Sequence, residues 1–227
     1  AVRCWYHGLE HALAILENRR PRWLADWAAD MLERNPRSWS LVRLLCRQGL
    51  IARPEGEAYI LGMITGPSRG AALDILQEDP NLLEELENLF QIEGRGEFSL
   101  AAYDKYVSIQ SSWSYALQEL SGRGQIERAL LLRWSLEALR RDFETFRAGW
   151  FSRFHESLQP NLKERCALLS FYLPLLGSRV RPTVSFALKA LQIIAKAGQL
   201  PAEDYGREVT SVLTSPGLTV KARRPCW

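Results

Sequence analysis

The residue pattern most suggestive of catalysis lies near the start of the chain. His7, Glu10 and His11 spell H-x-x-E-H, an inverted form of the zinc-peptidase motif. Because residues four apart share one face of a helix, both imidazoles could bind one zinc ion, with Glu10 as general base. A third protein ligand would have to come from elsewhere in the chain, and Gly8 weakens the helix that the site needs. A helical face with two solvated histidines explains the motif more simply.

A second stretch combines aromatic rings with arginines. Phe146, Trp150 and Phe154 recur at steps of four residues, and Arg147 and Arg153 lie among them. Rings and guanidinium groups together can stack bases and bind phosphates, and HEAT-like DNA glycosylases use concave surfaces of this composition. However, steps of four match one face of a helix, so packing in a core explains the rings more simply. We keep the two arginines as candidate partner-binding residues.

A narrow polar ridge marks the helical segment 182–197. This segment carries two apolar stripes, and a helix that is apolar on two sides is expected to pack between neighbouring helices. Four positions stay polar, at steps of four, three and four: Ser185, Lys189, Gln192 and Lys196. In stacked helix pairs the second helix lines the concave face, so the ridge is a candidate contact surface for a partner. The alternative is an ordinary solvated stripe.

The other reactive residue types lack the arrangement that a catalytic or metal site needs. The four cysteines are far apart and form no C-x-x-C pair, which favours buried, reduced thiols over a zinc site. The acidic residues between positions 78 and 87 are typical of a helix N-terminus beside solvent. Gly94 and Gly96 follow no strand and precede no Lys-Ser/Thr pair, so they form no phosphate loop. We therefore predict no catalytic residues, no bound metal and no cofactor.

Charge and hydropathy narrow the class of partner. The 29 basic and 26 acidic residues give a net charge of only +3, whereas nucleic-acid-binding proteins usually carry a clearer basic excess. The chain has no apolar run long enough for a membrane span, and its first residues do not resemble a signal peptide. Reduced cysteines indicate the cytosol. We expect a cytoplasmic protein with a protein partner and no membrane contact, and nucleic acid is the alternative partner.

The elements that position these residues are predicted to be helices, because no stretch alternates with period two for long enough to build a sheet. We predict an irregular helical part over residues 1–92, a loop-rich link over 93–110, and helical repeats over 111–227. The clearest helices are predicted at 126–141, 145–158 and 182–197. A further helix begins at Asn161, and Pro174 should kink it.

A weak internal repeat supports stacked helix pairs. Thr183-Val184 recurs 36 residues later as Thr219-Val220, and residues 202–213 would form the intervening helix. This period lies in the range of helical repeat arrays, of which HEAT-like repeats fit best. Pro225 then stops a helix that has barely begun, so we expect the array to be truncated at its C-terminus.

Four segments resemble a bacterial family known as a domain of unknown function, which occurs in larger proteins with HEAT-like repeats: 58–63, 99–106, 141–155 and 182–191. The resemblance covers nearly the whole chain, to about Ala222. It implies further repeats in other members and supplies no catalytic residues.

The sequence thus predicts an all-α fold, a HEAT-like α-α superhelix built as a solenoid of antiparallel helix pairs. Its predicted function is that of a non-catalytic scaffold or adaptor, which holds a protein on the concave face of the array. A nucleic-acid-binding HEAT-like module, with a surface like that of a DNA glycosylase, is the alternative. A zinc peptidase at His7, Glu10 and His11 ranks third.

Overall fold

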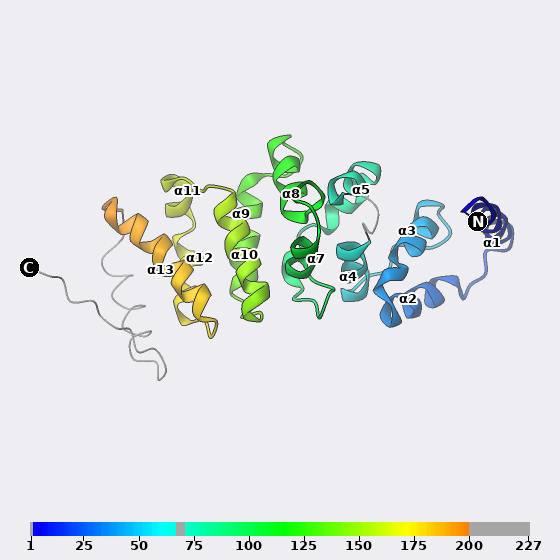
Figure 1. The fold of residues 1–227 in the computed structure, drawn as a ribbon, viewed down its shortest axis with the longest axis horizontal. Coiled ribbons are helices and arrows are strands. Elements are labelled where there is room, and N and C mark those ends of the chain that lie inside the picture. Colours follow the sequence, from blue (N-terminus) through cyan, green and yellow to red (C-terminus); the bar gives the residue numbers. More distant parts are fainter. Residues whose placement is uncertain (1, 67–70, 200–227) are drawn as a thin grey trace, which may run out of the picture.

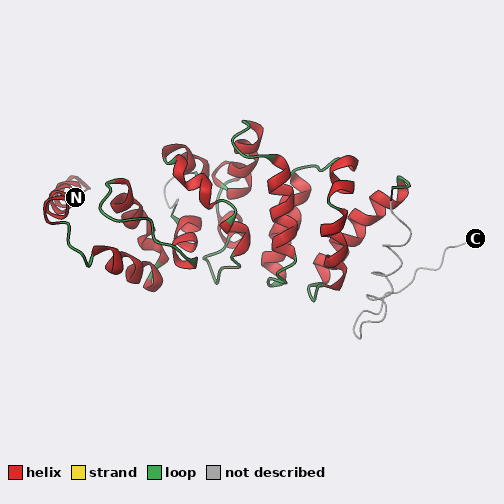
Figure 2. Cartoon of the chain, turned by 180° about the vertical axis from the view of Figure 1, so that it is seen from behind, coloured by secondary structure: helices red, strands yellow, loops and turns green. Residues whose placement is uncertain are grey.

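The structure is a computed structural model that describes residues 2–66 and 71–199, with side chains from residue 11 onward. Within these ranges every regular element is a helix, and the only bridge between extended residues joins Arg95 to Phe98. Figure 2 shows these helices joined by loops, with no strand among them. The predicted all-α class is therefore confirmed.

The helices follow one another in chain order along the long axis of the molecule (Figure 1). Helix α1 (Val2–Arg19) lies at one end, and helix α13 (Arg181–Lys196) lies toward the other. No helix in the described ranges has both the length and the apolar character needed to cross a membrane.

Between these ends, longer helices alternate with short 3-10 turns. The elements of the first half are α2 (Leu24–Arg34), η1 (Pro36–Ser38), α3 (Trp39–Arg47), α4 (Glu57–Thr65), α5 (Ala72–Glu78), η2 (Pro80–Glu85) and α6 (Asn88–Gln91). Those of the second half are α7 (Leu100–Tyr106), η3 (Ile109–Ser111), α8 (Trp113–Gly122), α9 (Arg128–Leu139), α10 (Thr145–Ser157), α11 (Leu162–Ala167), α12 (Leu169–Tyr172) and η4 (Leu173–Gly177).

Four of these helices form a continuous row, which we call the α13 row. Helix α4 contacts α7, α7 contacts α10, and α10 contacts α13. In Figure 1 the four lie one after another along the lower side of the ribbon. A second set runs beside them, in which α5 contacts α8, α6 contacts α9, and α9 contacts α12. The two sets are joined by contacts of α7 with α8, α9 with α10, and α12 with α13.

The core is continuous across the predicted boundary between residues 1–92 and 111–227. The indole Nε1 of Trp113 donates a hydrogen bond of 2.9 Å to the carbonyl oxygen of Ile64. The Phe90 ring lies at the centre of an aromatic cluster, with ring centroids 5.7 to 6.4 Å from those of Trp134, Trp150, Phe151 and Phe154. Buried residues from α2 to α13 belong to one hydrophobic cluster. No break in packing separates the two halves.

The stretch 93–110, which we expected to be a loop-rich link, contains helix α7. Ser99 caps this helix, since its hydroxyl accepts a hydrogen bond from the backbone N–H of Ala102. The first turn is anchored because Leu100, Ala101 and Ala102 are buried. Burial against α4, α8 and α10 stabilises this helix of only seven residues, and the residues before it, 93–99, lie outside any helix.

The turn between α9 and α10 sets the orientation of α10. Asp142 adopts a left-handed backbone with φ of 53°, a conformation that aspartate tolerates better than most residues. Its carboxylate accepts a hydrogen bond from the Ser178 hydroxyl and one from the Arg179 backbone N–H. The turn is thereby tied to the segment that precedes α13, so α10 and α13 are fixed relative to each other.

The segment that begins at Asn161 is divided more than expected. Asn161 and Glu164 form a reciprocal capping box at the start of α11, as the asparagine suggested. However, α11 ends at Ala167, α12 follows, and Pro174 lies in the 3-10 turn η4 rather than at a kink within one helix. The predicted helix at 202–213, the second Thr-Val pair at 219–220 and the truncation at Pro225 lie outside the described residues.

Candidate binding surface

A hollow of about 330 Å³ opens between α7, α8 and α10. We call it the α7–α10 hollow. Its lining includes Asp104 and Lys105 from α7, and Phe146, Trp150 and Arg153 from α10. It therefore lies between two neighbouring helices of the α13 row, and it contains one of the two arginines that the sequence singled out.

The one carboxylate of the hollow, that of Asp104, already has hydrogen-bond partners within the protein. The Asp104 carboxylate accepts hydrogen bonds from the backbone N–H groups of Trp113 and Ser114, at 2.7 and 3.0 Å, and from the indole Nε1 of Trp150 at 2.9 Å. The two backbone donors belong to the first turn of α8, where the helix dipole also favours a negative charge. Asp104 thus connects α7 to α8 and α10, and three of its acceptor positions are taken by donors of the protein itself.

The two cations of the hollow, in contrast, have no acidic partner among the described residues. The Lys105 ammonium lies 5.1 Å from the ring centroid of Tyr106 and 5.7 Å from that of Phe146. Arg153 is exposed, and its guanidinium group extends over Gly149 of the preceding turn. The hollow therefore presents two available positive charges beside aromatic rings.

The aromatic stripe of α10 divides between core and surface. Trp150 and Phe154 stack with an interplanar angle of 8° and a centroid distance of 5.1 Å, and both are buried. Phe146, however, is 46% exposed. Packing in a core is thus the right interpretation for two of the three rings, whereas the third forms part of the wall of the hollow.

Arg147 is placed differently from Arg153. Its Nη1 atom lies 3.0 Å from a Glu93 carboxylate oxygen and 2.9 Å from one of Glu144, and its side chain is only 15% exposed. The Glu93 carboxylate also accepts a hydrogen bond from the backbone N–H of Glu144. Arg147 therefore ties the segment before α7 to the start of α10, which makes it a weaker candidate for partner contact than Arg153.

The polar ridge of α13 lies at the surface, as the spacing suggested: Ser185, Lys189, Gln192 and Lys196 are all exposed. Within residues 71–199 none of these four side chains has a hydrogen bond or an ion pair. Ile193, an apolar residue of the same helix, is 45% exposed. The ridge thus lies on α13, and the α7–α10 hollow is bordered by α10. These two helices contact each other in the α13 row.

The H-x-x-E-H motif falls within α1, so all three of its residues are helical. His11 is exposed, and the side chains of His7 and Glu10 are outside the described ones. Among the described side chains, no group of histidine, cysteine, aspartate or glutamate is arranged to hold a metal ion. The structure adds nothing in favour of a zinc site at this motif.

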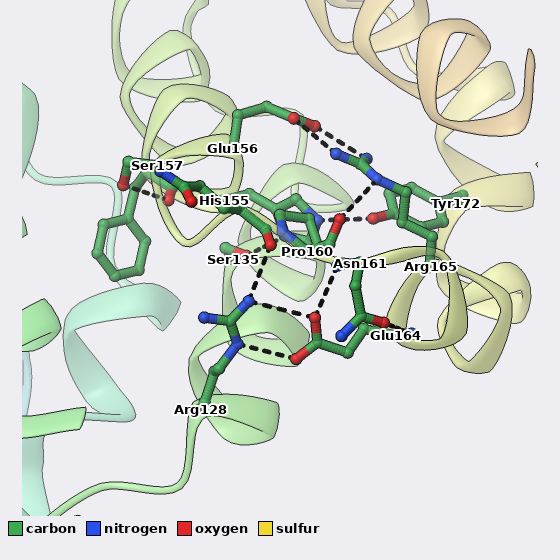
Figure 3. Close-up of polar contacts among 12 residues, drawn as sticks. Arg128, Ser135, His155, Glu156, Ser157, Pro160, Asn161, Glu164, Arg165 and Tyr172 are labelled. Carbon is green, nitrogen blue, oxygen red and sulfur yellow. Dashed lines mark hydrogen bonds and ion pairs between the residues drawn. The ribbon is translucent and has the colours of Figure 1, made fainter. Parts of the chain in front are cut away.

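A buried polar network lies on the other side of α10, and the sequence gave no indication of it (Figure 3). His155 is 0% exposed, and its ring lies between the side chains of Ser135 and Tyr172. Its Nδ1 atom is 2.8 Å from the Ser135 hydroxyl, and its Nε2 atom is 2.6 Å from the Tyr172 hydroxyl. The Tyr172 and Phe186 rings meet the imidazole edge to face.

The hydrogen bonds of this network assign the proton on the imidazole. The Ser135 hydroxyl donates to the carbonyl oxygen of Leu132 at 2.8 Å, so it accepts from Nδ1–H of His155. Nε2 then accepts from the Tyr172 hydroxyl. Burial lowers the pKa of His155 to about 4, and the Glu156 carboxylate opposes this shift only in part. Although a serine next to a histidine can act as a nucleophile, this imidazole is closed to solvent and its role is structural.

Two arginines surround the buried network and link the helices around it. Arg165 is buried; it donates to both carboxylate oxygens of Glu156 and to the carbonyl oxygen of Pro160. Arg128 of α9 makes a bidentate ion pair with Glu164 of α11. Figure 3 shows these contacts on either side of His155. Together they fix α11 against α9 and α10.

Residues 3–217 match the family model described as domain of unknown function DUF6493. The chain therefore belongs to this family. No curated protein and no solved structure matches it.

Proposed function

We propose that this DUF6493 chain is a non-catalytic scaffold or adaptor, in which a HEAT-like solenoid of antiparallel helix pairs holds a partner protein. The partner-binding surface would be the α13 row, as the concave face of the array. The resemblance noted in the sequence and the unpaired thiols of Cys46 and Cys166 support a bacterial, cytoplasmic protein.

The pattern of contacts supports a repeat array. Helices of the α13 row pack on one another in sequence, and each also packs on a helix of the second set. Stacked repeats have this property, because each unit contacts only its neighbours and the array presents a long rigid surface.

The observation that carries the proposal is the set of cations without acidic partners on the α13 row. Lys105 and Arg153 line the α7–α10 hollow, and Lys189 and Lys196 lie on the neighbouring helix. Arg128, Arg147 and Arg165 of the same part of the chain instead form ion pairs with carboxylates. Arginine and aromatic rings are enriched where proteins contact each other, and Arg153 and the exposed Phe146 ring both line the hollow.

The second candidate is a nucleic-acid-binding module. It is favoured by one observation, the exposed Phe146 ring next to Lys105 and Arg153, because aromatic and cationic side chains together can hold a nucleic-acid strand. Such binding would fall steeply as salt rises, since phosphate contacts release counterions.

An affinity pull-down separates the two candidates. The tagged chain is incubated with lysate of its host, with and without nuclease, and the bound proteins are identified by mass spectrometry. We expect a defined set of proteins that survives nuclease and moderate salt. Recovery that disappears with nuclease would establish the nucleic-acid candidate instead, and no specific recovery in either arm would refute both.

The matched variant is Lys189→Glu combined with Lys196→Glu. Both side chains are exposed on α13, so the double change should weaken partner recovery without lowering the melting temperature. A variant that unfolds would show that the ridge is part of the packing and not of the binding surface.

A further inference from the structure

We propose that the α7–α10 hollow recognises an acidic peptide segment of the partner. Lys105 and Arg153 would bind a carboxylate of that segment, and an adjacent apolar side chain would pack against Phe146. This inference rests on the proposed scaffold function and adds the chemistry of what the scaffold holds.

Charge complementarity is the first argument. The hollow contains two cations and one carboxylate, and that carboxylate accepts three N–H hydrogen bonds from the protein itself. A guanidinium group offers paired donors that match a carboxylate, so Arg153 is suited to a bidentate contact.

The aromatic side chains supply the apolar part of the site. Phe146 lines the hollow and is 46% exposed, and the Lys105 ammonium lies near its ring. The ammonium also lies near the ring of Tyr106, which is 79% exposed and stands outside the lining of the hollow. Lys105, Tyr106 and Phe146 are all exposed, so the contact of the ammonium with the two rings is not part of the packing of the core. Tyrosine, phenylalanine and arginine are enriched where proteins contact each other, and rings beside desolvated charges carry much of the binding energy.

The size and rigidity of the hollow favour a short segment. Its volume of about 330 Å³ suits one or two side chains of a peptide. Its floor is the stacked pair Trp150 and Phe154, which is buried, and its rim is fixed by a hydrogen bond of 3.2 Å from the Gln118 amide to the Ser157 hydroxyl. A site that is formed before binding loses less entropy when the ligand is ordered in it.

The surroundings of the hollow favour a peptide over nucleic acid. A nucleic-acid strand needs a continuous basic track for its phosphates. Here Arg147, the other arginine of α10, is held in ion pairs with Glu93 and Glu144. Lys105 and Arg153 are therefore not continued by further unpaired cations along this helix, and a peptide needs only one carboxylate at these two cations.

The test is selection from a displayed library of random short peptides. The full chain and its double variant Lys105→Glu, Arg153→Glu are each used as bait. We expect the unchanged chain to enrich peptides in which Asp or Glu stands beside Phe, Leu or Trp, and the double variant to lose them. Enrichment of neutral or basic peptides, or equal selection by the double variant, would overturn the proposal, as would failure to enrich any motif.

Binding constants then assign the contacts. For an enriched peptide, fluorescence anisotropy should show that Arg153→Glu weakens binding by about tenfold or more, and that replacing the peptide acid by its amide does the same. Phe146→Ala should weaken binding severalfold without changing the charge of the protein.

Lys163→Glu is the control, because Lys163 is an exposed lysine of α11 outside the hollow. This variant should bind the peptide like the unchanged chain. An equal loss with Lys163→Glu would mean that net charge, and not the hollow, decides binding.

An oligothymidine strand tests the other class of ligand in the same assay. Tight binding of this strand that depends on Arg153 would overturn the peptide proposal. The inference and the proposed scaffold function can also fail separately. If the pull-down recovers a partner that Lys105→Glu with Arg153→Glu still binds, the hollow is not the site although the scaffold function stands.

Discussion

His155 and Arg153 are two residues apart on α10, but they belong to opposite kinds of polar site. His155 points into the packing with α9, α12 and α13, where both ring nitrogens have partners and solvent is excluded. Arg153 points into the α7–α10 hollow, is exposed, and has no acidic partner in the described part of the chain. The same helix thus contributes a buried histidine to a closed network and an exposed arginine to the hollow.

The difference shows how to separate stabilising groups from binding groups in this chain. A buried polar group must be satisfied within the protein, and removing one partner leaves the other without a hydrogen bond. An exposed cation can be satisfied by water and contributes little to folding, so it is available to a ligand. Substitutions on the two sides of α10 should therefore change different measurable quantities.

The largest effect should come from removing the imidazole. His155→Ala leaves the Ser135 and Tyr172 hydroxyls without their buried partner and opens a cavity. We expect the free energy of unfolding to fall by about 4 kcal/mol, measured by chemical denaturation. His11→Ala is the matched control, since His11 is exposed on α1 and its loss should be nearly neutral. Similar losses of unfolding free energy for both variants would show that the buried network does not contribute more to stability than an exposed histidine.

The next effect is a dependence of stability on pH. Burial lowers the pKa of His155 in the folded state to about 4, from the usual 6.5. Between these values the unfolded chain binds more protons, so stability is full above pH 6.5 and falls as the pH drops toward 4. The expected loss is about 3 kcal/mol. Because His155→Gln lacks this titration, the difference between the two denaturation series isolates it; parallel series would contradict the lowered pKa.

A smaller loss of stability is expected from removing the Tyr172 hydroxyl. Tyr172→Phe keeps the ring that packs against Phe186 and removes only the hydroxyl that donates to His155 Nε2. The cost should be about 1–2 kcal/mol in unfolding free energy, and the pKa of His155 should change, as a titration followed by NMR would show. No change in either quantity would mean that water replaces the hydroxyl without loss.

The smallest effect on stability should come from the open side of α10. Arg153→Glu and Lys105→Glu should each change the unfolding free energy by less than about 0.5 kcal/mol, because the replaced charges are exposed and have no acidic partner in the described residues. The same variants should have the large effects on peptide binding set out above. Marked destabilisation by either would show that the hollow is part of the packing, and the contrast between the two sides of α10 would be lost.

The strong helices could be predicted from the sequence because local signals and burial agree there. Helix α10 was expected at 145–158 and spans Thr145–Ser157, and α13 was expected at 182–197 and spans Arg181–Lys196. In both, apolar residues at helical spacing coincide with buried positions along most of the helix. The exposure of the ridge on α13 followed from the same periodicity.

Other features depended on contacts between distant residues and left no local signal. Helix α7 is short, and contacts with α8 and α10 through Asp104 secure it. His155 stood alone in the sequence because its partners are 20 and 17 residues away, on different helices. The exposure of Phe146 could not be foreseen either, since its spacing is the same as that of Trp150. Trp150 is buried by residues distant in sequence, among them Phe90 and Asp104.

The chain-order packing of the helices has a consequence for how the protein is made. Each helix packs mainly on elements close to it in sequence, so a contact requires the closure of only a short loop. Helices that leave the ribosome first can therefore pack before the remainder is translated. The chain can gain its core step by step during synthesis, and the apolar surface left uncovered at any moment is limited to the growing end.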